Sequence, residues 1–207
     1  MSDLSGLSDS VETWPVIATD VVASGSIVQF RRDTVQMPDG QDVGRDVVVH
    51  PGAVAVLALD EVGRVLLIRQ YRHPVGRLLW EIPAGLRDVP GEPLEETARR
   101  ELLEEAGYQA ADWQVLADVF TSPGISSERL RLFLAKDLTY VPESDRDYIP
   151  DHEEAHLIIE WAPLEEVVSR FLNGDLHNGV TAVGALAAYA ARQGGFAALR
   201  GTDAPER

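Results

Sequence analysis

Apolar and polar positions follow one another along much of the chain in short runs that predict strands. β-Branched and other apolar residues gather between Gly, Pro and Asp turn residues, and several of these runs are nearly continuous, as in buried strands. The sequence MPDGQD, residues 37–42, is typical of a turn that closes a hairpin. Pro51-Gly52 interrupts a long apolar run and predicts a bend or bulge. The predicted strands are 14–23, 26–37, 45–59, 65–74, 78–85, 113–120, 129–135 and 156–162.

A period of four residues predicts a helix over 94–107. Pro93 suits the first helical position, and Gly107 suits the position just past the end. Two closing helices are predicted over 163–174 and 179–194, the second of them rich in alanine. The order of strands, helix, strands and two helices predicts an α+β fold, or an α/β fold with a mixed sheet. The residues that mark the buried stripe of the first helix are Leu94, Ala98, Leu102 and Ala106.

The length of 207 residues fits one domain of ordinary to large size. Ser-, Asp- and Gly-containing ends predict frayed tails at residues 1–12 and 196–207. Between these tails we expect an N-terminal β region over 13–45 and a main domain over 46–195. The sequence contains neither an internal repeat nor a linker long enough to divide the chain further.

Composition excludes several classes of function. Lys and Arg number 18 against 34 Asp and Glu, so the formal charge of −16 argues against a general binder of nucleic acid or anionic membranes. With no cysteine, the chain has no disulfides, thiolate metal sites or cysteine nucleophiles. No apolar run approaches the ~20 residues of a membrane span. The N-terminus lacks the basic-then-apolar order of a signal peptide, so we expect a cytoplasmic protein.

Three glutamates of the first helix carry the most specific chemical signal. Glu101 and Glu105 are four residues apart and Glu104 is three from Glu101, so all three carboxylates project from one side. Carboxylates held this close repel one another, and a divalent cation relieves that repulsion; hard oxygen ligands suit Mg²⁺ or Mn²⁺. The alternative is a solvated acidic helix on which Arg100 pairs with Glu104.

The arrangement around these glutamates resembles the Nudix box, G-x5-E-x7-R-E-U-x-E-E-x-G-U, where U is an apolar residue. One departure is visible: six residues rather than five separate the glycine from the first glutamate, and the extra residue falls in the loop before the helix, where insertions are tolerated. The fixed places are filled by Gly85, Glu92, Arg100, Glu101, Leu102, Glu104, Glu105 and Gly107, and the last apolar place by Tyr108.

The resemblance implies a Nudix-type α/β/α sandwich with a mixed β-sheet, preceded by the N-terminal β-hairpin region. It also implies hydrolysis of a nucleoside diphosphate linked to another moiety. Glu101, Glu105 and the Ala84 carbonyl would ligate Mg²⁺, with Mn²⁺ as a substitute. Glu104 would assist both as ligand and in catalysis, and Arg100 would orient the carboxylates. Metal would neutralise the pyrophosphate and acidify a water, which explains how so acidic a protein holds a polyanion.

Segments on both sides of the box resemble the ADP-ribose pyrophosphatase subfamily. The matching runs are RQYRHPVGRLLWEIPAGL, residues 69–86, and TSPGISSE, residues 121–128. In this subfamily the arginine at the place of Arg72 contacts the pyrophosphate, and the strand that carries Arg45 and Asp46 approaches the adenine. The further residues that the resemblance assigns to the substrate are Leu86, Ser122, Pro123, Gly124 and Glu128.

Each of these positions also has a purely structural interpretation. Arg72 could form a surface salt bridge, and Pro123-Gly124 could be an ordinary turn. Trp80, just before the box, favours core packing over base stacking. His50, His73 and His177 are isolated in the sequence and favour structural roles.

A rival motif lies in the sequence HEEAH at residues 152–156, which satisfies H-E-x-x-H. On a helix this pattern holds zinc with Glu153 as general base. Here Pro150 precedes it and a strand-like run follows, so the zinc interpretation is disfavoured. By resemblance, this loop would instead supply the catalytic base, with Glu154 favoured over Glu153. Both glutamates could also simply face solvent.

Together these observations predict Mg²⁺-dependent hydrolysis of ADP-ribose to AMP and ribose 5-phosphate. One alternative is another nucleoside diphosphate sugar, such as GDP-mannose. A second is a ligand-sensing Nudix module without turnover, although such modules usually lose box carboxylates that this chain keeps. In this subfamily the N-terminal region exchanges between two subunits, so the resemblance implies a homodimer. We expect no nucleic-acid or membrane partner.

Overall fold

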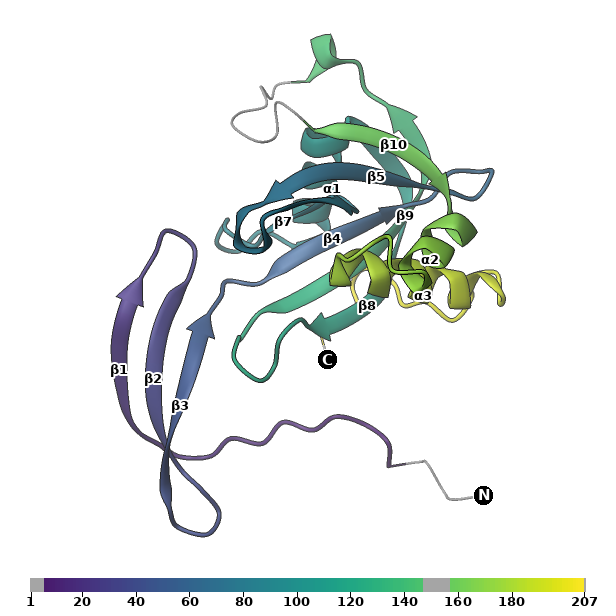
Figure 1. The fold of residues 1–207 in the computed structure, drawn as a ribbon. Coiled ribbons are helices and arrows are strands. Elements are labelled where there is room, and N and C mark those ends of the chain that lie inside the picture. Colours follow the sequence, from purple (N-terminus) through teal and green to yellow (C-terminus); the bar gives the residue numbers. More distant parts are fainter. Residues whose placement is uncertain (1–5, 147–156, 207) are drawn as a thin grey trace. The chain divides into compact units, whose positions relative to one another are not determined.

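The computed structural model of the chain describes residues 6–146 and 157–206. The chain divides into two compact units (Figure 1). The N-terminal unit comprises residues up to His50 together with Gly124–Ser127, and the main unit comprises Pro51–Pro123 and the residues from Glu128 onward.

The N-terminal unit is a three-stranded antiparallel sheet. Its strands are β1 (Val16–Ser24), β2 (Gln29–Gln36) and β3 (Asp42–Val49), in the order β1-β2-β3. The turn predicted at 37–42 joins β2 to β3, so this hairpin is confirmed. The segment Gly124–Ser127 belongs to the same unit, because Ser126 forms a parallel bridge with Val48.

The main unit contains two sheets. The first is mixed: β7 (Ala84–Leu86), β4 (Ala53–Ala58), β9 (Arg129–Tyr140) and β8 (Tyr108–Phe120) lie in that order, and only the β4–β9 pair is parallel. The second sheet is antiparallel, and its strands lie in the order β10-β5-β6. These are β10 (Ile158–Pro163), β5 (Arg64–Arg72) and β6 (Arg77–Glu81).

One predicted strand, 78–85, is divided in the structure. Its first half belongs to β6 in the antiparallel sheet and its end to β7 in the mixed sheet. The break falls at Ile82-Pro83, where proline has no N–H for a ladder. The Pro83 carbonyl instead accepts a hydrogen bond from the Val56 N–H at 2.8 Å. This change of sheet carries the chain from β5 and β6 to the glycine of the box.

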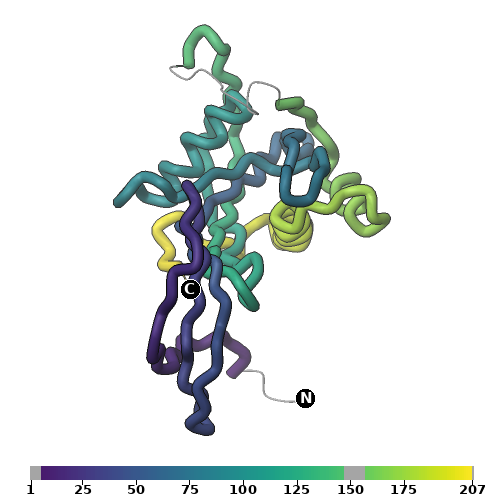
Figure 2. Tube along the Cα trace, turned by 60° about the vertical axis from the view of Figure 1, so that its left-hand side comes forward, coloured from purple at the N-terminus to yellow at the C-terminus, as the bar shows by residue number. Residues whose placement is uncertain are grey.

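The helices cover both faces of β4. Alternate residues of that strand enter two cores: Val54 and Val56 pack in the cluster that holds α1 (Leu94–Ala106), whereas Ala55 and Leu57 pack in the cluster that holds α2 (Leu164–Leu172) and α3 (Gly179–Arg192). Figure 2 shows α1 in teal on one side of these strands and α2 and α3 in green to yellow on the other. The predicted α/β/α sandwich is confirmed. Two short 3₁₀ helices, His73–Val75 and Glu143–Asp145, complete the described elements.

The ends of α1 agree with the sequence analysis except at its first residue. Pro93 is the N-cap rather than the first helical residue, because its extended backbone, with ψ of 142°, places it outside the helix. Gly107 ends the helix with φ of 73°, a left-handed conformation in which a side chain would be strained. Ala98, Leu102 and Ala106 of the predicted stripe are fully buried, which fixes the rotation of the helix.

The C-terminal segment differs from the frayed tail that the sequence predicts over 196–207. Arg200 forms a β-bridge with Val115, and the Arg131 guanidinium donates to the Ala204 carbonyl at 2.8 Å. Glu206 pairs with Arg87 at 3.1 Å. These contacts join the segment to β8, to β9 and to the residue after β7, and composition alone does not reveal such partners. Within residues 6–146 and 157–206, no helix is both long and apolar enough to cross a bilayer.

Candidate active site

A cleft of about 280 Å³ lies in the main unit where α1 passes the end of β5 and the strand β7. Its lining is strongly polar, with four carboxylates and two guanidinium groups. The lining residues are Gln70, Arg72, Ala84, Gly85, Leu86, Asp88, Arg100, Glu101, Glu104 and Glu105. Every residue that the box resemblance assigns to metal therefore lies in one cleft, together with Arg72 and Leu86 of the implied substrate contacts.

The three carboxylates of α1 reach this cleft because they flank the stripe of the helix that is anchored in the core. Leu102, on the helix, is buried against strands of the mixed sheet. The positions beside it on the helix therefore turn toward the cleft. Glu101 and Glu105 are only 8% and 7% exposed, respectively. Buried carboxylates require charge or hydrogen-bond partners. The cleft supplies both.

Gly85 allows Glu101 to lie directly against the backbone of β7. A Cβ atom at Gly85 would stand 2.0 Å from the Glu101 Cδ, well inside van der Waals contact. Next to it, the Ala84 N–H donates a hydrogen bond of 2.8 Å to Glu105 Oε2. The strand and the helix thus hold two carboxylates in fixed positions, and the fixed glycine of the box has a steric explanation.

Arg100 draws the acidic groups together. Its Nη1 donates to Glu101 Oε1 at 2.7 Å and to Glu104 Oε2 at 3.2 Å. Its Nη2 lies 3.5 Å from Asp88 and 3.4 Å from Glu92. Burial lowers the pKa of Arg100, but the surrounding carboxylates outweigh it and hold the pKa above its ordinary value. Arg100 therefore stays charged and remains paired with the carboxylates.

Glu92, the first glutamate of the box, supports the start of α1 rather than lining the cleft. Its Oε2 accepts a hydrogen bond of 2.8 Å from the Thr97 hydroxyl. That bond, with the charge of Arg100, holds the pKa of Glu92 below its usual range despite partial desolvation. The extra residue in the preceding loop leaves this contact intact.

Arg72 forms a salt bridge, as its structural interpretation allowed, with a partner, Glu81, that the sequence did not identify. Its Nε and Nη2 both donate to the Glu81 carboxylate, the shorter contact being 2.6 Å. Glu81 is 3% exposed, whereas the Arg72 side chain is 43% exposed. The pair spans β5 and β6, so only the strand register reveals it. Its geometry fixes the guanidinium while leaving part of it open to the cleft.

Gln70 is a second lining residue that sequence reasoning missed. Its side chain is buried, and its Oε1 finds no hydrogen-bond partner among residues 6–146 and 157–206. A hydrated cation or a bound water would supply the missing hydrogen bond to this acceptor, which lies in a cleft with four carboxylates. The alternation of β5 carries the only sequence signal, because it puts Gln70 and Arg72 on the same face.

The remaining residues that the resemblance assigns to the substrate do not line this cleft in the described structure. Ser122 and Pro123 are exposed between β8 and β9 of the main unit, and the Thr121 hydroxyl donates to Glu128 nearby. Arg45, Asp46 and Gly124 belong to the N-terminal unit, where Asp46 pairs with Arg32 at 2.7 Å. The HEEAH sequence, with Glu153 and Glu154, lies outside the described residues.

The cleft fits a hard divalent cation by its chemistry. Its side-chain donors are carboxylate and amide oxygens, the ligands that Mg²⁺ and Mn²⁺ prefer. In the part of the chain that the structure describes, no three acidic or histidine side chains already converge as a ligand set. Glu101 and Glu104 are turned to Arg100, and Glu105 to the Ala84 N–H. Binding of a cation would therefore exchange some of these hydrogen bonds for metal contacts.

A helix that presents a row of glutamates to a glycine-containing strand, within an α/β/α sandwich, defines the Nudix class of hydrolases. The model of the NUDIX domain matches residues 49–181, and the chain belongs to the Nudix hydrolase family.

Within this family, the chain is similar to proteins named ADP-ribose pyrophosphatase. The chain is 46% identical over 187 residues to the ADP-ribose pyrophosphatase of Mycobacterium tuberculosis, covering 90% of this chain and 88% of the relative. It is 40% identical over 127 residues to the ADP-ribose pyrophosphatase of Bacillus subtilis, covering 61% and 68%. Among solved structures, an ADP compounds hydrolase matches with a TM-score of 0.73 at 21% identity, covering 91% of this chain and 98% of the other. That structure confirms the fold.

Proposed function

We propose that the protein hydrolyses the pyrophosphate bond of ADP-ribose, with water, to AMP and ribose 5-phosphate. The observation that carries the proposal is the single cleft in which Glu101, Glu104 and Glu105 meet Arg72. The 46% identity to a protein named ADP-ribose pyrophosphatase, over nearly the whole chain, supports the choice of substrate.

The chain's own residues would share the work of binding and positioning. Glu101, Glu104, Glu105 and the Ala84 carbonyl would hold Mg²⁺ or Mn²⁺, which supplies positive charge at the pyrophosphate and lowers the pKa of an attacking water. Arg100 would hold the carboxylates in orientation through its hydrogen bonds to Glu101 and Glu104. Arg72, braced by Glu81, would donate to the pyrophosphate oxygens. The rate gain would come from positioning and charge stabilisation in this cleft.

A general base would take the proton of the attacking water, and we assign this role to Glu154. The sequence HEEAH follows the box by more than forty residues, and the family resemblance favours Glu154 over Glu153. Replacing each separately with glutamine tests the choice. Glu154→Gln should cut kcat by about a hundredfold or more, as loss of a general base does, while Glu153→Gln leaves most of it. The reverse result would move the role to Glu153.

The rest of the substrate would contact residues on three other segments. Leu86 lines the cleft beside Gly85 and would touch the substrate. We assign the terminal ribose to Ser122, Pro123, Gly124 and Glu128, and the adenine side to the strand with Arg45 and Asp46.

A substrate panel under fixed Mg²⁺ tests the proposal. Phosphate released from the products by an added phosphatase measures hydrolysis of ADP-ribose, GDP-mannose and other nucleoside diphosphate sugars. We expect the highest kcat/KM with ADP-ribose. A higher value with GDP-mannose would identify the alternative substrate class, and saturable binding without any turnover would identify a sensing module.

We also propose that the protein is a homodimer through its N-terminal unit. Val16, Ile17, Val21 and Val22 of β1 are each more than half exposed, and every residue of this strand is exposed. A lone three-stranded sheet with such a surface needs a cover for its apolar side chains. Light scattering at micromolar concentration should give twice the chain mass, and a monomeric mass would refute the dimer.

A further inference from the structure

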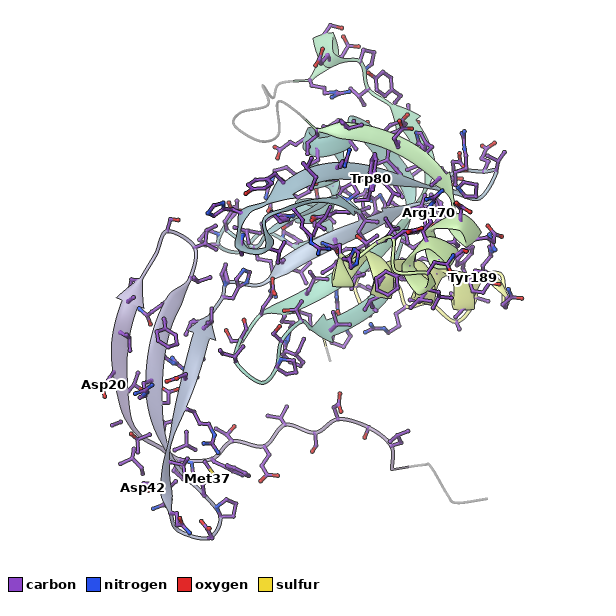
Figure 3. The ribbon with its side chains drawn as sticks, viewed as in Figure 1. Asp20, Met37, Asp42, Trp80, Arg170 and Tyr189 are labelled. Atoms are coloured by element: carbon purple, nitrogen blue, oxygen red, sulfur yellow. The ribbon has the colours of Figure 1, made fainter. Side chains whose placement is uncertain are left out.

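A second groove lies in the main unit, away from the box carboxylates. It consists of two adjoining cavities of about 470 and 300 Å³, which share Trp80, Asp175 and Leu176. The walls come from the sheet β10-β5-β6, from α2, and from the segment between α2 and α3. Figure 3 labels two of the lining residues, Trp80 on β6 and Arg170 on α2. Volumes of this size suit a small organic ligand.

The strand register separates this groove from the catalytic cleft. Arg69 of β5 is paired directly with Trp80 of β6, whereas Glu81 is paired with Ile68. Neighbouring residues on a strand point to opposite faces, so Gln70 and Glu81 serve one face and Arg69 and Trp80 the other. The two sites therefore share a sheet but not a surface.

Two arginines and one carboxylate, Asp175, line the smaller cavity, so its lining carries a net positive charge. Arg69 and Arg77 both line it, and neither has a carboxylate within 4.0 Å in the described part of the chain. The Arg69 Nε is buried and has no hydrogen-bond partner among the described residues. His177 lines the same cavity. In a chain with a net charge of −16, two arginines without acidic partners around one cavity indicate an anion site.

Trp80 lines both cavities and provides an aromatic surface beside the arginines. Trp80 is half-buried, and the Arg69 guanidinium lies 5.6 Å from the centre of its ring. Buried Leu67 and Leu176 form apolar walls beside it. Rings prefer to bind against such a flat apolar surface.

The part of the larger cavity that the smaller one does not share presents hydrogen-bond acceptors. Glu160 of β10 lines it and has no ion-pair partner in the described part of the chain. Glu166 also lines it and is paired with Arg170 at 2.7 Å. Acceptors in this part suit the amino group of a base, whereas the cationic end suits a phosphate. The groove is thus polarised along its length.

We propose that this groove is a binding site for a nucleoside monophosphate. The phosphate lies between Arg69 and Arg77, and the base lies against Trp80 with its amino group toward Glu160. The site is separate from catalysis, and it does not require a divalent cation. It stands whether or not ADP-ribose is the substrate of the catalytic cleft.

Calorimetric titration of the full chain with AMP in the presence of EDTA tests this site. Without divalent cations the carboxylates of the catalytic cleft repel phosphate, so binding reports on the groove. We expect saturable binding of one AMP per chain. Arg69→Gln and Arg77→Gln should each weaken it by about tenfold or more, because each removes a charged hydrogen bond. Arg192→Gln is the matched control, since this arginine lies on α3 outside both cavities and pairs with Glu165; it should leave AMP binding unchanged.

Several results would overturn the proposal. Equal AMP affinity in the Arg77→Gln variant and the wild-type chain would show that the arginines do not bind the phosphate. Arg77 is exposed, so this variant should fold even if Arg69→Gln does not. Inorganic phosphate that binds as tightly as AMP would show an anion site without a base site. Adenosine that binds as tightly would show that the arginines contribute nothing. Turnover with Mg²⁺ should persist in both variants, which separates this test from that of the catalytic cleft.

Discussion

At the scale of single residues, Arg100 is notable because it contacts several carboxylates at once. One guanidinium faces Glu101, Glu104, Glu92 and Asp88, all within 3.5 Å. Four carboxylates line the cleft against two guanidinium groups, of which Arg72 is already paired with Glu81, so the cleft keeps a surplus of negative charge. That surplus is the physical reason to expect divalent cations there, and it makes each glutamate sensitive to substitution in its own way.

Glu105→Gln should abolish most activity while preserving the fold. The amide keeps an acceptor for the Ala84 N–H but loses the negative charge that a cation requires. We expect kcat to fall by about a hundredfold or more, a loss at least as large as that of residues that only support metal ligands. Steady-state kinetics with ADP-ribose measure it. Glu96→Gln makes the same change on an exposed position of the same helix and should stay near wild type.

Gly85→Ala should act through Glu101. Its Cβ would meet the Glu101 Cδ at 2.0 Å, so the carboxylate must move away from the cleft. We expect a higher Mg²⁺ concentration at half-maximal rate and a lower kcat, measured by titrating Mg²⁺ at saturating ADP-ribose. Gly179→Ala adds the same methyl group to open space at the start of α3 and should change neither quantity. Equal effects of the two substitutions would refute the steric role of Gly85.

At the scale of elements, the sequence predicts helices and strands well where a single periodic pattern runs through the whole element and one of its faces is buried. The stripe of α1 and its glycine end, and the strand before the 37–42 turn, are found within a few residues of their predicted bounds. The run predicted over 45–59 is divided between β3 and β4 at Pro51-Gly52, where the sequence predicts a bend. The box glutamates share a cleft because helical spacing alone fixes their side. A pattern that spans 24 residues needs no long-range information.

Contacts between distant strands could not be predicted in the same way. Glu81 looks like one more acidic residue before the box, and only the pairing of β5 with β6 makes it the partner of Arg72. The separation of β6 from β7 depends on how Pro83 meets Val56 of another strand. Gln70 is a candidate because its side chain is buried. Its polar side chain predicts an exposed position instead, so the sequence does not single it out.

Glu81→Gln tests the link between β6 and the cleft. The amide loses the charge that holds Arg72, so the guanidinium becomes free to adopt other rotamers. We expect KM for ADP-ribose to rise by about tenfold, as loss of one charged hydrogen bond allows, with a smaller change in kcat. Kinetics of Arg72→Ala should show the same direction. A Glu81→Gln variant with unchanged KM and kcat would show that Arg72 needs no brace.

At the scale of the whole molecule, the C-terminal segment completes the main unit. Asp118 of β8 pairs with Arg131 at 2.6 Å and with Arg200 of the C-terminal segment at 2.9 Å. The Asp118 and Arg131 side chains are 7% and 4% exposed, respectively. A buried ion pair of this kind adds little over an apolar alternative, but removing one partner leaves the other charge buried and unpaired.

Asp118→Ala should therefore lower the free energy of unfolding by about 3 kcal/mol near neutral pH, as breaking a buried pair does. Urea unfolding measures it. Asp112→Ala, on the same strand but paired with Lys136 near the surface, should cost less than about 1 kcal/mol. A loss in Asp118→Ala as small as in this control would contradict a structural role for the C-terminal segment.

The same substitution makes a prediction about pH. Burial raises the pKa of Asp118, but the bonds from Arg131 and Arg200 outweigh it and lower the pKa below the reference of 3.8. A carboxylate with a depressed folded-state pKa stabilises above its unfolded pKa and loses that contribution as pH falls through the folded value. The wild-type advantage over Asp118→Ala should thus be constant above pH 5 or so and shrink below about pH 4.

The most direct test of the central claim is calorimetric titration of the purified chain with Mn²⁺, with and without AMP. The claim is that the carboxylates of α1 form a site for divalent cations. It predicts saturable heat of binding in the wild-type chain that Glu101→Gln and Glu105→Gln each weaken severely and Glu96→Gln leaves intact. Absence of Mn²⁺ uptake, or uptake equal in all four proteins, would contradict the account.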